Sequence, residues 1–511
     1  MVVENTENRK NVLVIVCDQF RYDCIRALGN STILTPNLDR LVERGTSFTN
    51  AYSSCPVCVA ARYTIMTGRE PHTTGCYANE PPKGAAELPQ NIEERCGAYL
   101  ARVMSARGYR TFGIGKFHTK PDCYENLGFE VHKHTEELWE NTEIKKRDAY
   151  AGMIMHDHPE YAHIDQLHGE RTNMYYVPQM SPLPAELTVE AVTSNLAVQE
   201  LNKEDTRPYF GYVSFVGPHP PCAPPAPYHL LYDPDIMENP YRTTDENDFA
   251  DEQIPWMNYA IWAEDISDGW ARNIKSRYYA EITYIDSCIG QMLDVMDKKN
   301  AWENTLVIFT SDHGDHMGDH GAWQKESFFE QSCKVPFIVC TPGMKGGVKD
   351  DRLVSLCDLF GIVTSASGKI EVRDGIDILG GEAREYVYGM YGRPGTERFK
   401  LMVRGGDYKY IYISNGGREQ FYDVRKDPKE TENLVADDDK TARECGEDIE
   451  KVLEIFRGEA KKYCNNPGLC EALRSWRFPY HERKRQRIHQ FEFSKNIDDF
   501  QVSGGNYFSS M

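Results

Sequence analysis

The sequence has few of the features that mark membrane, nucleic-acid-binding or disulfide-rich proteins. Its 511 residues contain 58 Lys and Arg against 78 Asp and Glu, so the formal net charge is −20. This deficit of positive charge argues against nucleic acid or another bulk polyanion as a partner, although a small anionic substrate could bind in a locally basic pocket. The start of the chain is polar and no long apolar run follows it, so we expect no secretory signal and no membrane segment.

A disulfide framework is also not expected. The 15 cysteines are scattered, and an odd number cannot all pair. Reduced thiols suit a reducing compartment, so we expect a cytoplasmic protein. Internal repeats and low-complexity segments are absent as well. With 40% hydrophobic residues over this length, the chain predicts a large globular domain and a smaller one.

Apolar runs typical of buried strands alternate with helical patterns. The strands are predicted at 11–17, 109–114, 208–216, 305–310 and 336–340, and helices at 35–45, 92–107, 276–299 and 445–464. The run at 11–17 is rich in β-branched residues, as central parallel strands are. The pattern predicts an α/β fold with a large, mostly parallel central sheet between helices.

The character of the sequence changes at three places. We predict a catalytic domain at 1–375 with an insertion near 130–184, a small α+β subdomain at 376–465 and an aromatic, basic tail at 466–511. The insertion is expected to cover the active-site face and to contribute substrate specificity. The histidines of the insertion include His156, His158, His163 and His168. They could form a second metal site, but solvated positions in a loop are the simpler expectation. The tail is expected to dock on this subunit or on a second copy, which would give a homo-oligomer.

The stretch 56–69, PVCVAARYTIMTGR, contains a cysteine four residues before an arginine. If a helix begins near Ala60, Cys58 lies at its N-terminus, where backbone N–H groups favour negative charge. Arg62, one turn later, then points back at the same place. A thiol is a poor nucleophile toward a sulfate or phosphate ester, and an isolated cysteine is usually a buried thiol. These residues alone therefore predict no hydrolysis.

Polar residues follow two of the predicted strands. Asp18 and Gln19 come after the first strand, and Asp312 and His313 after the strand at 305–310. The carboxyl ends of parallel strands line the ligand crevice of α/β sheets, so we expect these strands to be neighbours and their ends to hold a metal ion. For Asp18 the alternative is a helix-capping role. Oxygen and imidazole ligands suit Ca²⁺ or Mg²⁺, with Mn²⁺ or Zn²⁺ as alternatives because of the histidine.

Further histidines and a lysine lie near other strand ends. Lys116 and His118 are two residues apart, so on an extended segment they would face the same side. The prolines of the GPHPP run at 217–221 fix the backbone and present His219 stiffly. His316 and His320 could be additional ligands, but we expect them to order a loop.

The stretch around Cys58 resembles the signature of type I sulfatases and of their relatives the phosphonate monoester hydrolases, Cys-x-Pro/Ala-x-Arg followed by Thr-Gly-Arg. The GKFH element at 115–118, the PHPP element at 218–221 and the GDHG run followed by Lys325 resemble family elements in the same order. The resemblance covers most of the chain, except for the insertion and the tail. It implies an alkaline-phosphatase-like fold.

The resemblance also implies roles for the site residues. In that family the cysteine is oxidised to formylglycine, whose hydrated aldehyde is the nucleophile. One divalent cation, with Ca²⁺ as first choice, would be bound at five positions: Asp18, Gln19, Cys58, Asp312 and His313. Arg62, Lys116 and Lys325 would neutralise the sulfate oxygens. His219 would protonate the leaving oxygen, and His118 would accept the proton of the remaining hydroxyl.

The predicted function is hydrolysis of a sulfate monoester of a sugar, aryl or choline-type alcohol. Sulfatases commonly have aspartate where this chain has Gln19, a departure shared with the phosphonate branch and with some sulfatases. The pair Lys116 and His118 resembles the sulfatase branch instead. Phosphonate monoester or phosphodiester hydrolysis is therefore the alternative. A non-catalytic binder of sulfated glycans would lack a nucleophile or a ligand, and none is missing.

Ala60 bears on how Cys58 would be modified. The aerobic formylglycine-generating enzyme of the family prefers proline at this position, whereas the anaerobic radical maturase accepts alanine. The resemblance therefore implies a maturase as a partner and an anaerobic bacterium as the source. Alanine also leaves the segment more flexible than proline would. The alternative is that the maturase ignores this position.

Overall fold

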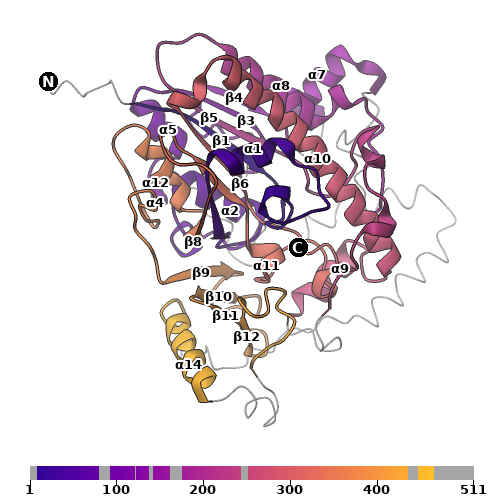
Figure 1. Ribbon diagram of the computed structural model, residues 1–511, viewed down its shortest axis with the longest axis vertical. Coiled ribbons are helices and arrows are strands. Elements are labelled where there is room, and N and C mark those ends of the chain that lie inside the picture. The colour runs from indigo at the N-terminus through magenta and orange to yellow at the C-terminus, as the bar shows by residue number, and fades with distance from the viewer. Residues whose placement is uncertain are drawn as a thin grey trace.

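The computed structural model describes residues 9–79, 92–120, 122–136, 142–161, 175–242, 251–435 and 447–464. They form two β-sheets of different size with helices packed around them (Figure 1). The predicted tail at 466–511 lies outside the described residues, as do His163 and His168.

The central sheet has eight strands in the order β4-β3-β5-β1-β6-β7-β2-β8. The strands are β1 Asn11–Cys17, β2 Thr46–Tyr52, β3 Arg110–Gly115, β4 Val131–His134, β5 Tyr209–Phe215, β6 Thr305–Ser311, β7 Phe337–Cys340 and β8 Val348–Ser355. All run in one direction except β7, which is antiparallel to both β6 and β2. The prediction of a large, mostly parallel sheet is confirmed.

The α-helices connect these strands and follow them. They are α1 Pro36–Arg44, α2 Cys58–Thr67, α3 Pro71–Thr74, α4 Ile92–Cys96, α5 Leu100–Ala106, α6 Thr142–Arg147, α7 Ala149–Asp157, α8 Val189–Asn202, α9 Gln253–Ala260, α10 Asp268–Lys298, α11 Glu330–Cys333, α12 Asp358–Ser365 and α14 Glu447–Lys461. Within the described ranges, no helix is both long and apolar enough to cross a membrane.

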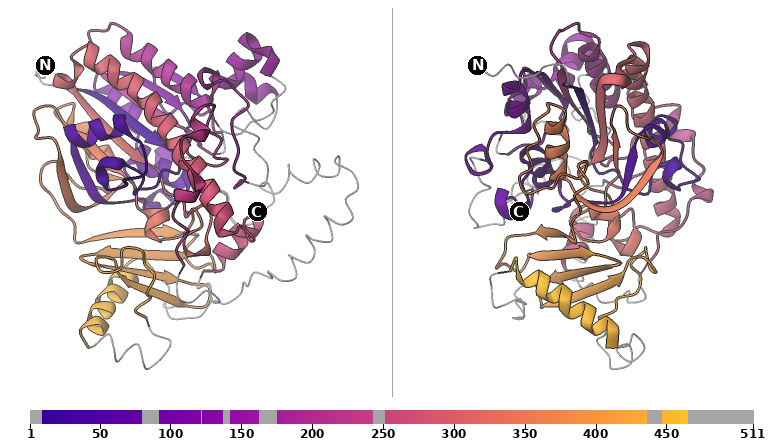
Figure 2. Two further views of the ribbon diagram at one scale, coloured as in Figure 1. Left: turned by 45° about the vertical axis from the view of Figure 1, so that its right-hand side comes forward. Right: turned by 60° about the vertical axis from the view of Figure 1, so that its left-hand side comes forward.

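Side chains on β1 show how the central sheet is covered on both faces. Val12 and Val14 point into a core that also contains residues of α2, α5 and α12. Leu13 and Ile15 point into the opposite core, formed with α1, α8 and α10. Because successive strand residues face opposite sides, a continuous apolar run requires helices on both faces. The helical layers on the two sides of the sheet can be followed in Figures 1 and 2.

The smaller sheet is antiparallel, in the order β12-β11-β10-β9. Its strands are β9 Tyr386–Tyr391, β10 Lys400–Gly405, β11 Tyr408–Ile413 and β12 Arg418–Asp423. Met402 packs into a core of the large sheet, whereas Leu401 packs in a cluster with Phe456 of α14. The small sheet therefore lies between the large domain and α14 (Figure 2). The backbone N–H of Met390 also donates to the carbonyl of Ser54 at 2.7 Å.

The helix predicted over 92–107 is interrupted. α4 ends at Cys96, and Gly97 follows with φ +88° before α5 begins at Leu100. A left-handed residue cannot continue a right-handed helix, and glycine adopts this conformation without steric cost. The apolar periodicity continues across the break because α4 and α5 contribute to the same core.

The segment predicted as an insertion, 130–184, begins inside the central sheet. β4 pairs in parallel with β3, with Val131 opposite Phe112. Further along, Tyr150 of α7 packs with Val189 of α8. The exposed ring of His156 lies 2.6 Å from Asp157, in a surface contact. Covering of the active-site face by this segment stays a prediction.

Candidate active site

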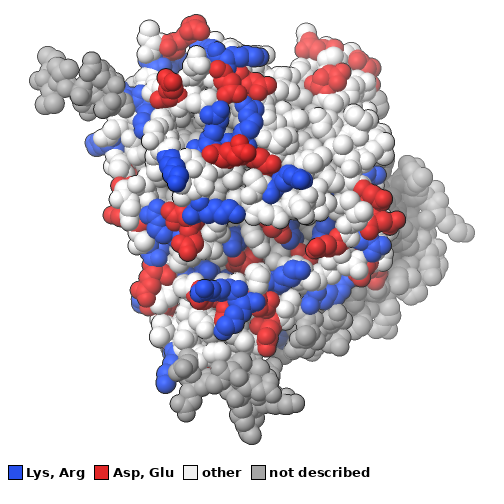
Figure 3. Space-filling model, in the orientation of Figure 1, with Lys and Arg blue, Asp and Glu red and all other residues white. Residues whose placement is uncertain are grey.

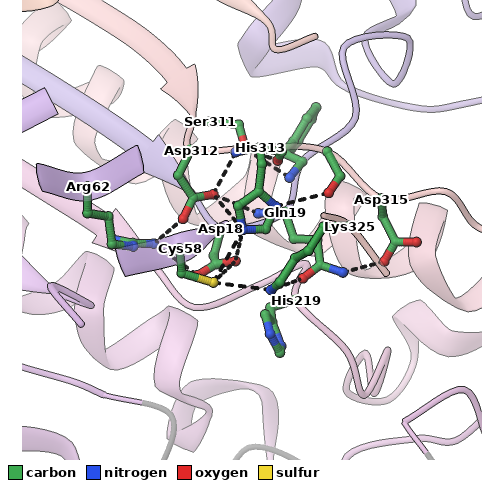
Figure 4. A network of polar contacts seen from close by, with 12 residues as sticks. Asp18, Gln19, Cys58, Arg62, His219, Ser311, Asp312, His313, Asp315 and Lys325 are labelled. Carbon is green, nitrogen blue, oxygen red and sulfur yellow. Dashed lines mark hydrogen bonds and ion pairs between the residues drawn. The ribbon is translucent and has the colours of Figure 1, made fainter. Parts of the chain in front are cut away.

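The predicted metal ligands lie at the carboxyl ends of two adjacent strands. β1 pairs with β6 in parallel, with Cys17 opposite Ser311, so Asp18 and Asp312 leave the sheet side by side. The prediction that these two strands are neighbours is confirmed. α2 begins at Cys58 and directs its N-terminus to the same place (Figure 4).

Cys58 is buried among polar groups. Its Sγ lies 3.2 Å from His313 Nε2, 3.1 Å from Lys325 Nζ and 3.8 Å from a carboxylate oxygen of Asp18. Cys58 is the first residue of α2, so the positive end of the helix dipole lies beside the thiol. None of the described cysteines forms a disulfide. These surroundings differ from the apolar site of an ordinary buried thiol.

Asp18, Cys58, Asp312 and His313 offer one ligand atom each, all buried and within 4.8 Å of one another. His313 Nδ1 lies 3.0 Å from the carbonyl oxygen of Gly314, which favours the tautomer with the Nε2 lone pair toward the cluster. Burial lowers the pKa of His313 and keeps the ring neutral, as a ligand must be. Among the described residues, Asp312 Oδ2 accepts no hydrogen bond. This donor set fits a divalent cation.

Two cations balance the buried carboxylates. Arg62 Nη2 lies 3.0 Å from Oδ2 of both Asp18 and Asp312, and Lys116 Nζ lies 2.6 Å from Asp18 Oδ2. Burial opposes the ionised form of Asp18, but Lys116 and Arg62 outweigh it and hold the pKa of this carboxyl well below its usual value. The cations predicted to face the sulfate group therefore belong to the same cluster.

Gly115 allows β3 to end in close contact with β5. This contact positions Arg62 and Lys116. Gly115 has φ +110°, and a Cβ there would stand 1.8 Å from the carbonyl oxygen of Ser214, so only glycine fits. The backbone N–H of Lys116 donates to that carbonyl at 2.9 Å. Arg62 Nη1 donates to the Lys116 carbonyl at 2.6 Å and to Ser214 Oγ at 2.8 Å.

Gln19 adopts a left-handed backbone conformation, with φ +64°, and is held by several hydrogen bonds. Its backbone N–H donates to Asp312 Oδ1 at 3.1 Å, its amide oxygen accepts from Lys325 Nζ at 2.8 Å, and its amide nitrogen donates to Asp315 at 2.5 Å. The hydroxyl of Tyr176 also donates to Asp315, at 2.5 Å. The amide oxygen thus faces the cluster, and its role as a metal ligand stays a prediction.

Lys325 is held by a loop in which both neighbouring residues are left-handed, with φ +70° at Gln324 and +75° at Glu326. The hydroxyl of Tyr391 donates to the carboxylate of Glu326 at 2.6 Å. The ammonium of Lys400 donates to the carbonyl of the same residue. Tyr391 on β9 and Lys400 on β10 are cross-strand partners. The small sheet therefore supports the loop that carries Lys325.

Replacing Lys400 by methionine should lower kcat about ten-fold with little change in KM, because Lys325 would keep its charge but lose its fixed position. Lys400 also forms an ion pair with Asp251 at 2.6 Å, so thermal melting should be measured alongside turnover. The exposed Lys426, on the same subdomain, provides the control Lys426→Met, which should change neither. A folded Lys400→Met protein with unchanged kcat would contradict this role.

His219 lies beyond the end of β5 in its run of prolines. Its Nδ1 lies 2.7 Å from the carbonyl oxygen of Pro220, so the neutral ring carries its hydrogen on Nδ1 and accepts on Nε2. The residue is buried and close enough to Asp18 to act on it electrostatically. Figure 4 shows its ring beside Lys325 at the cluster. The structure thus brings His219 to the predicted site.

Two buried glutamates pack behind Gly217, two residues before His219. A Cβ at Gly217 would stand 3.2 Å from an oxygen of Glu190 on α8 and 3.3 Å from an oxygen of Glu281 on α10. Burial and the charge of Glu190 raise the pKa of Glu281 well above its usual value. Burial and the like charge of Glu190 both favour the protonated form of Glu281, so we expect the two glutamates to share a proton in the folded protein.

Glu281→Gln should stabilise the protein at neutral and alkaline pH. The pKa of Glu281 is higher in the folded than in the unfolded protein. The free energy of unfolding therefore falls as pH rises from the unfolded-state pKa to the folded-state pKa. The glutamine removes this loss, so the melting temperature should rise by a few degrees at about pH 8 and change little near pH 4. The exposed Glu186→Gln is the matched control. An equal pH dependence of melting in wild type and Glu281→Gln would refute the shared proton.

His118 does not lie on an extended segment. β3 ends at Gly115, and His118 has φ +49°, so the argument that Lys116 and His118 must face the same side does not apply. The half-buried residue donates its backbone N–H to Glu136 at 3.2 Å. Burial raises the pKa of that carboxyl, but the hydrogen bond from His134 and the electrostatic effects of His134 and His118 outweigh it and lower the pKa below its usual value. A catalytic role for His118 stays a prediction.

His316 and His320 make contacts within their loop. His316 Nε2 lies 2.6 Å from Ser327 Oγ, and the ring of His320 stacks on Phe329 with centroids 3.9 Å apart. Burial lowers the pKa of both rings, that of His320 to about 3. These contacts agree with the expectation that the two histidines order the loop.

Relatives of known identity place the site in a family. The family described as Sulfatase matches residues 10–368. An arylsulfatase of Clostridium perfringens is 30% identical over 449 residues, which cover 84% of this chain and 90% of that protein. A choline-sulfatase of Rhizobium meliloti is 29% identical over 468 residues, which cover 84% of this chain and 83% of that protein.

Solved structures extend the comparison to the fold. The phosphonate monoester hydrolase of Agrobacterium radiobacter has a TM-score of 0.70 at 24% identity, over 88% of this chain and 96% of that one. At this identity the likeness shows the fold alone, an alkaline-phosphatase-like α/β architecture. The family match includes every predicted site residue, from Asp18 to Lys325. This chain belongs to the sulfatase family.

Proposed function

We propose that the protein hydrolyses a sulfate monoester to an alcohol and inorganic sulfate at Cys58, after conversion of this residue to formylglycine. The observation that carries the proposal is the convergence of Cys58 with ligand atoms and cations in one buried cluster. Although the net charge of the chain is −20, three cations lie together at this one site: Arg62, Lys116 and Lys325. Such an arrangement suits an anionic ester.

Each side chain then has a distinct task. Arg62, Lys116 and Lys325 would neutralise the sulfate oxygens and the charge that develops on them, each contributing on the order of a few kcal/mol. His219 would protonate the leaving oxygen from its rigid position. His118 would accept the proton of the remaining hydroxyl. The cluster is buried, so these charges interact more strongly than they would in bulk water.

Asp18, Asp312 and His313, with the Cys58 position and the amide oxygen of Gln19, would hold one divalent cation. Ca²⁺ is the proposed ion because oxygen donors predominate, and Mg²⁺, Mn²⁺ and Zn²⁺ are the alternatives. A bound cation would polarise a sulfate oxygen and lower the pKa of the attacking hydroxyl. The buried ligand atoms of Asp18, Cys58, Asp312 and His313, all within 4.8 Å of one another, support this assignment.

Phosphonate monoester or phosphodiester hydrolysis is the second candidate, and Gln19 favours it. A glutamine in place of an aspartate leaves the cation site with one negative charge fewer. Lys325 donates to its amide oxygen instead of to a carboxylate. The pair of Asp18 with Lys116 argues for the sulfate ester, since the resemblance assigns this lysine to the sulfatase branch.

Turnover of matched aryl sulfate and aryl phosphonate esters, with and without added Ca²⁺, tests the proposal. Wild-type protein with modified Cys58 should hydrolyse the sulfate ester faster, and Cys58→Ala should hydrolyse neither. A faster phosphonate reaction would favour the second candidate. Tight binding of both esters by a wild type that turns over neither would indicate a non-catalytic binder. Cys123→Ala, away from the cluster, serves as the control substitution.

The substrate alcohol is proposed only as a class: a sugar, an aryl group or a choline-type alcohol. The names of the two relatives, an arylsulfatase and a choline-sulfatase, support the last two members of this class. The contact of Tyr176 with Asp315 brings residues of the segment 130–184 next to the cluster, which supports a role for this segment in selecting the alcohol. A panel of sulfate esters, compared by kcat/KM, would rank the three.

A further inference from the structure

A cavity of about 550 Å³ lies beside the loop that follows β1. Residues of α10, β2 and β8 line it, together with segments before β7 and after β12. None of the predicted site residues is among the described residues that line it. Its volume lies in the range of pockets that hold small organic ligands. Figure 3 shows one face of the molecule, on which basic and acidic side chains are interspersed.

Four lysines from four separate segments converge on this pocket: Lys275, Lys334, Lys349 and Lys429. Lys334 forms an ion pair with Glu330 at 2.9 Å. Lys349 and Lys429 form no ion pair with any described residue. Lys275 donates to a backbone carbonyl at 3.2 Å and acts electrostatically on Asp23 and Asp319. The chain has 78 acidic residues, so carboxylates were available as ion-pair partners for these lysines. Unpaired like charges repel one another, and a bound anion would offset this cost.

One arginine contacts two of the three acidic groups in the pocket wall. Arg21 lies 2.7 Å from Asp23 and 2.8 Å from Asp319, so one guanidinium binds both carboxylates. Glu238, which is exposed, is the third acidic group among the lining residues. Arg21 and the four lysines thus outnumber the three acidic residues of the lining.

Aromatic rings complete the pocket and hold two of the ammonium groups in place. Lys334 Nζ lies 4.8 Å from the ring centroid of Tyr22, and Lys429 Nζ lies 5.0 Å from that of Tyr241. Contacts of this kind favour the charged form of lysine and restrict its position. Rings beside fixed cations suit a ligand that has both an anionic group and a flat, weakly polar face.

We propose that this pocket binds a sulfate group, as a second oxyanion site separate from the Cys58 cluster. The choice of sulfate rests on the proposed function, since the substrate and the released product would both carry this group. The bound species is either free sulfate or a sulfate ester on a sugar unit, for which the volume suffices. Arg21 also donates to the carbonyls of Asp315 and His316, at 3.1 and 2.9 Å, so the site lies directly behind the loop that carries Asp312.

Binding of sulfate to wild type and to the double variant Lys349→Glu/Lys429→Glu tests the site. Both lysines are exposed, so the substitutions should not affect folding. Isothermal titration with inorganic sulfate, and separately with a sulfated disaccharide, should show two equivalents per chain for wild type. The double variant should keep one, with the affinity of the other at least ten-fold lower. Its kcat for a small aryl sulfate should stay unchanged.

The control is Lys345→Glu/Lys369→Glu, which makes the same charge change at exposed lysines outside the pocket. Equal sulfate binding by the pocket variant and wild type would overturn the proposal, as would an equal loss in the control. Saturation by inorganic sulfate would identify the free anion as ligand, and saturation by the disaccharide alone would identify the ester. If no sulfate ester is hydrolysed but the pocket variant still loses one equivalent, the proposed function fails and the pocket assignment stands.

Discussion

Asp312→Ala should lose its divalent cation and at least about a hundred-fold in kcat, which is typical when a group that stabilises developing charge is removed. Asp312 supplies the buried oxygen that accepts no hydrogen bond from the described residues. It also provides one of the two carboxylates that Arg62 binds at 3.0 Å. The alanine therefore removes a ligand and leaves the guanidinium with a single anionic partner. Elemental analysis of the purified protein and turnover of an aryl sulfate measure the two effects.

A buried aspartate on the same loop provides the control for this substitution. Asp319 pairs with Arg21 at 2.8 Å and lies outside the cluster. Asp319→Asn should therefore keep the cation and most of the turnover. An Asp312→Ala protein that retains both metal and full activity would show that the cation is bound elsewhere or that none is required.

His219→Ala should impair hydrolysis in proportion to how poor the leaving group is. A general acid typically contributes about 10² to 10⁴ in rate when the departing oxygen needs a proton. Sulfate esters of sugar alcohols should therefore lose about this factor, whereas nitrophenyl sulfate, whose phenolate leaves without a proton, should lose only a few-fold. Comparing kcat/KM for the two ester types in wild type and variant measures the difference.

His72→Ala, at a surface histidine, is the matched control and should affect neither substrate. Equal losses for sugar and nitrophenyl esters in His219→Ala would mean that this residue orders the site and transfers no proton. The hydrogen bond from Nδ1 to the Pro220 carbonyl, at 2.7 Å, leaves Nε2 as the nitrogen that would carry the transferred proton.

The parts of the site that follow strand ends were predictable because the signal is local. The β-branched run before Asp18 and the apolar run before Asp312 each indicate a buried strand, and the polar residue at its end marks the edge of the sheet. The bounds of β1 agree with the prediction residue by residue. The helix after Cys58 was expected near Ala60 and begins at Cys58 itself, whereas the role of this cysteine was implied by the resemblance alone.

Other parts could not be predicted because they depend on how distant segments pack. Tyr391 and Lys400 reach Glu326 only because the small sheet packs against the loop beside the cluster, and no pattern around either residue indicates this. The left-handed backbone at Gln19 and His118 also lies outside what strand periodicity describes. The compartment, the maturase and assembly through the tail stay predictions.

Maturation of Cys58 depends on the enzyme that modifies it. Ala60 is buried in α2 at the position where the resemblance associates proline with the aerobic enzyme and alanine with the anaerobic one. We therefore expect aerobic expression without a matching maturase to yield mostly unmodified Cys58 and little activity. Anaerobic co-expression with the radical maturase should restore both. Abundant aldehyde in the aerobic sample would show that Ala60 does not select the maturase.

Mass spectrometry of the peptide that contains Cys58, on the samples used for turnover, is the most direct test. If Cys58 acts as formylglycine, kcat per chain should rise in proportion to the aldehyde fraction and extrapolate to zero when only the thiol is present. Samples from aerobic and anaerobic expression, mixed in known ratios, provide a range of aldehyde fractions. High turnover of a sulfate ester by protein whose Cys58 is entirely unmodified would contradict the mechanism.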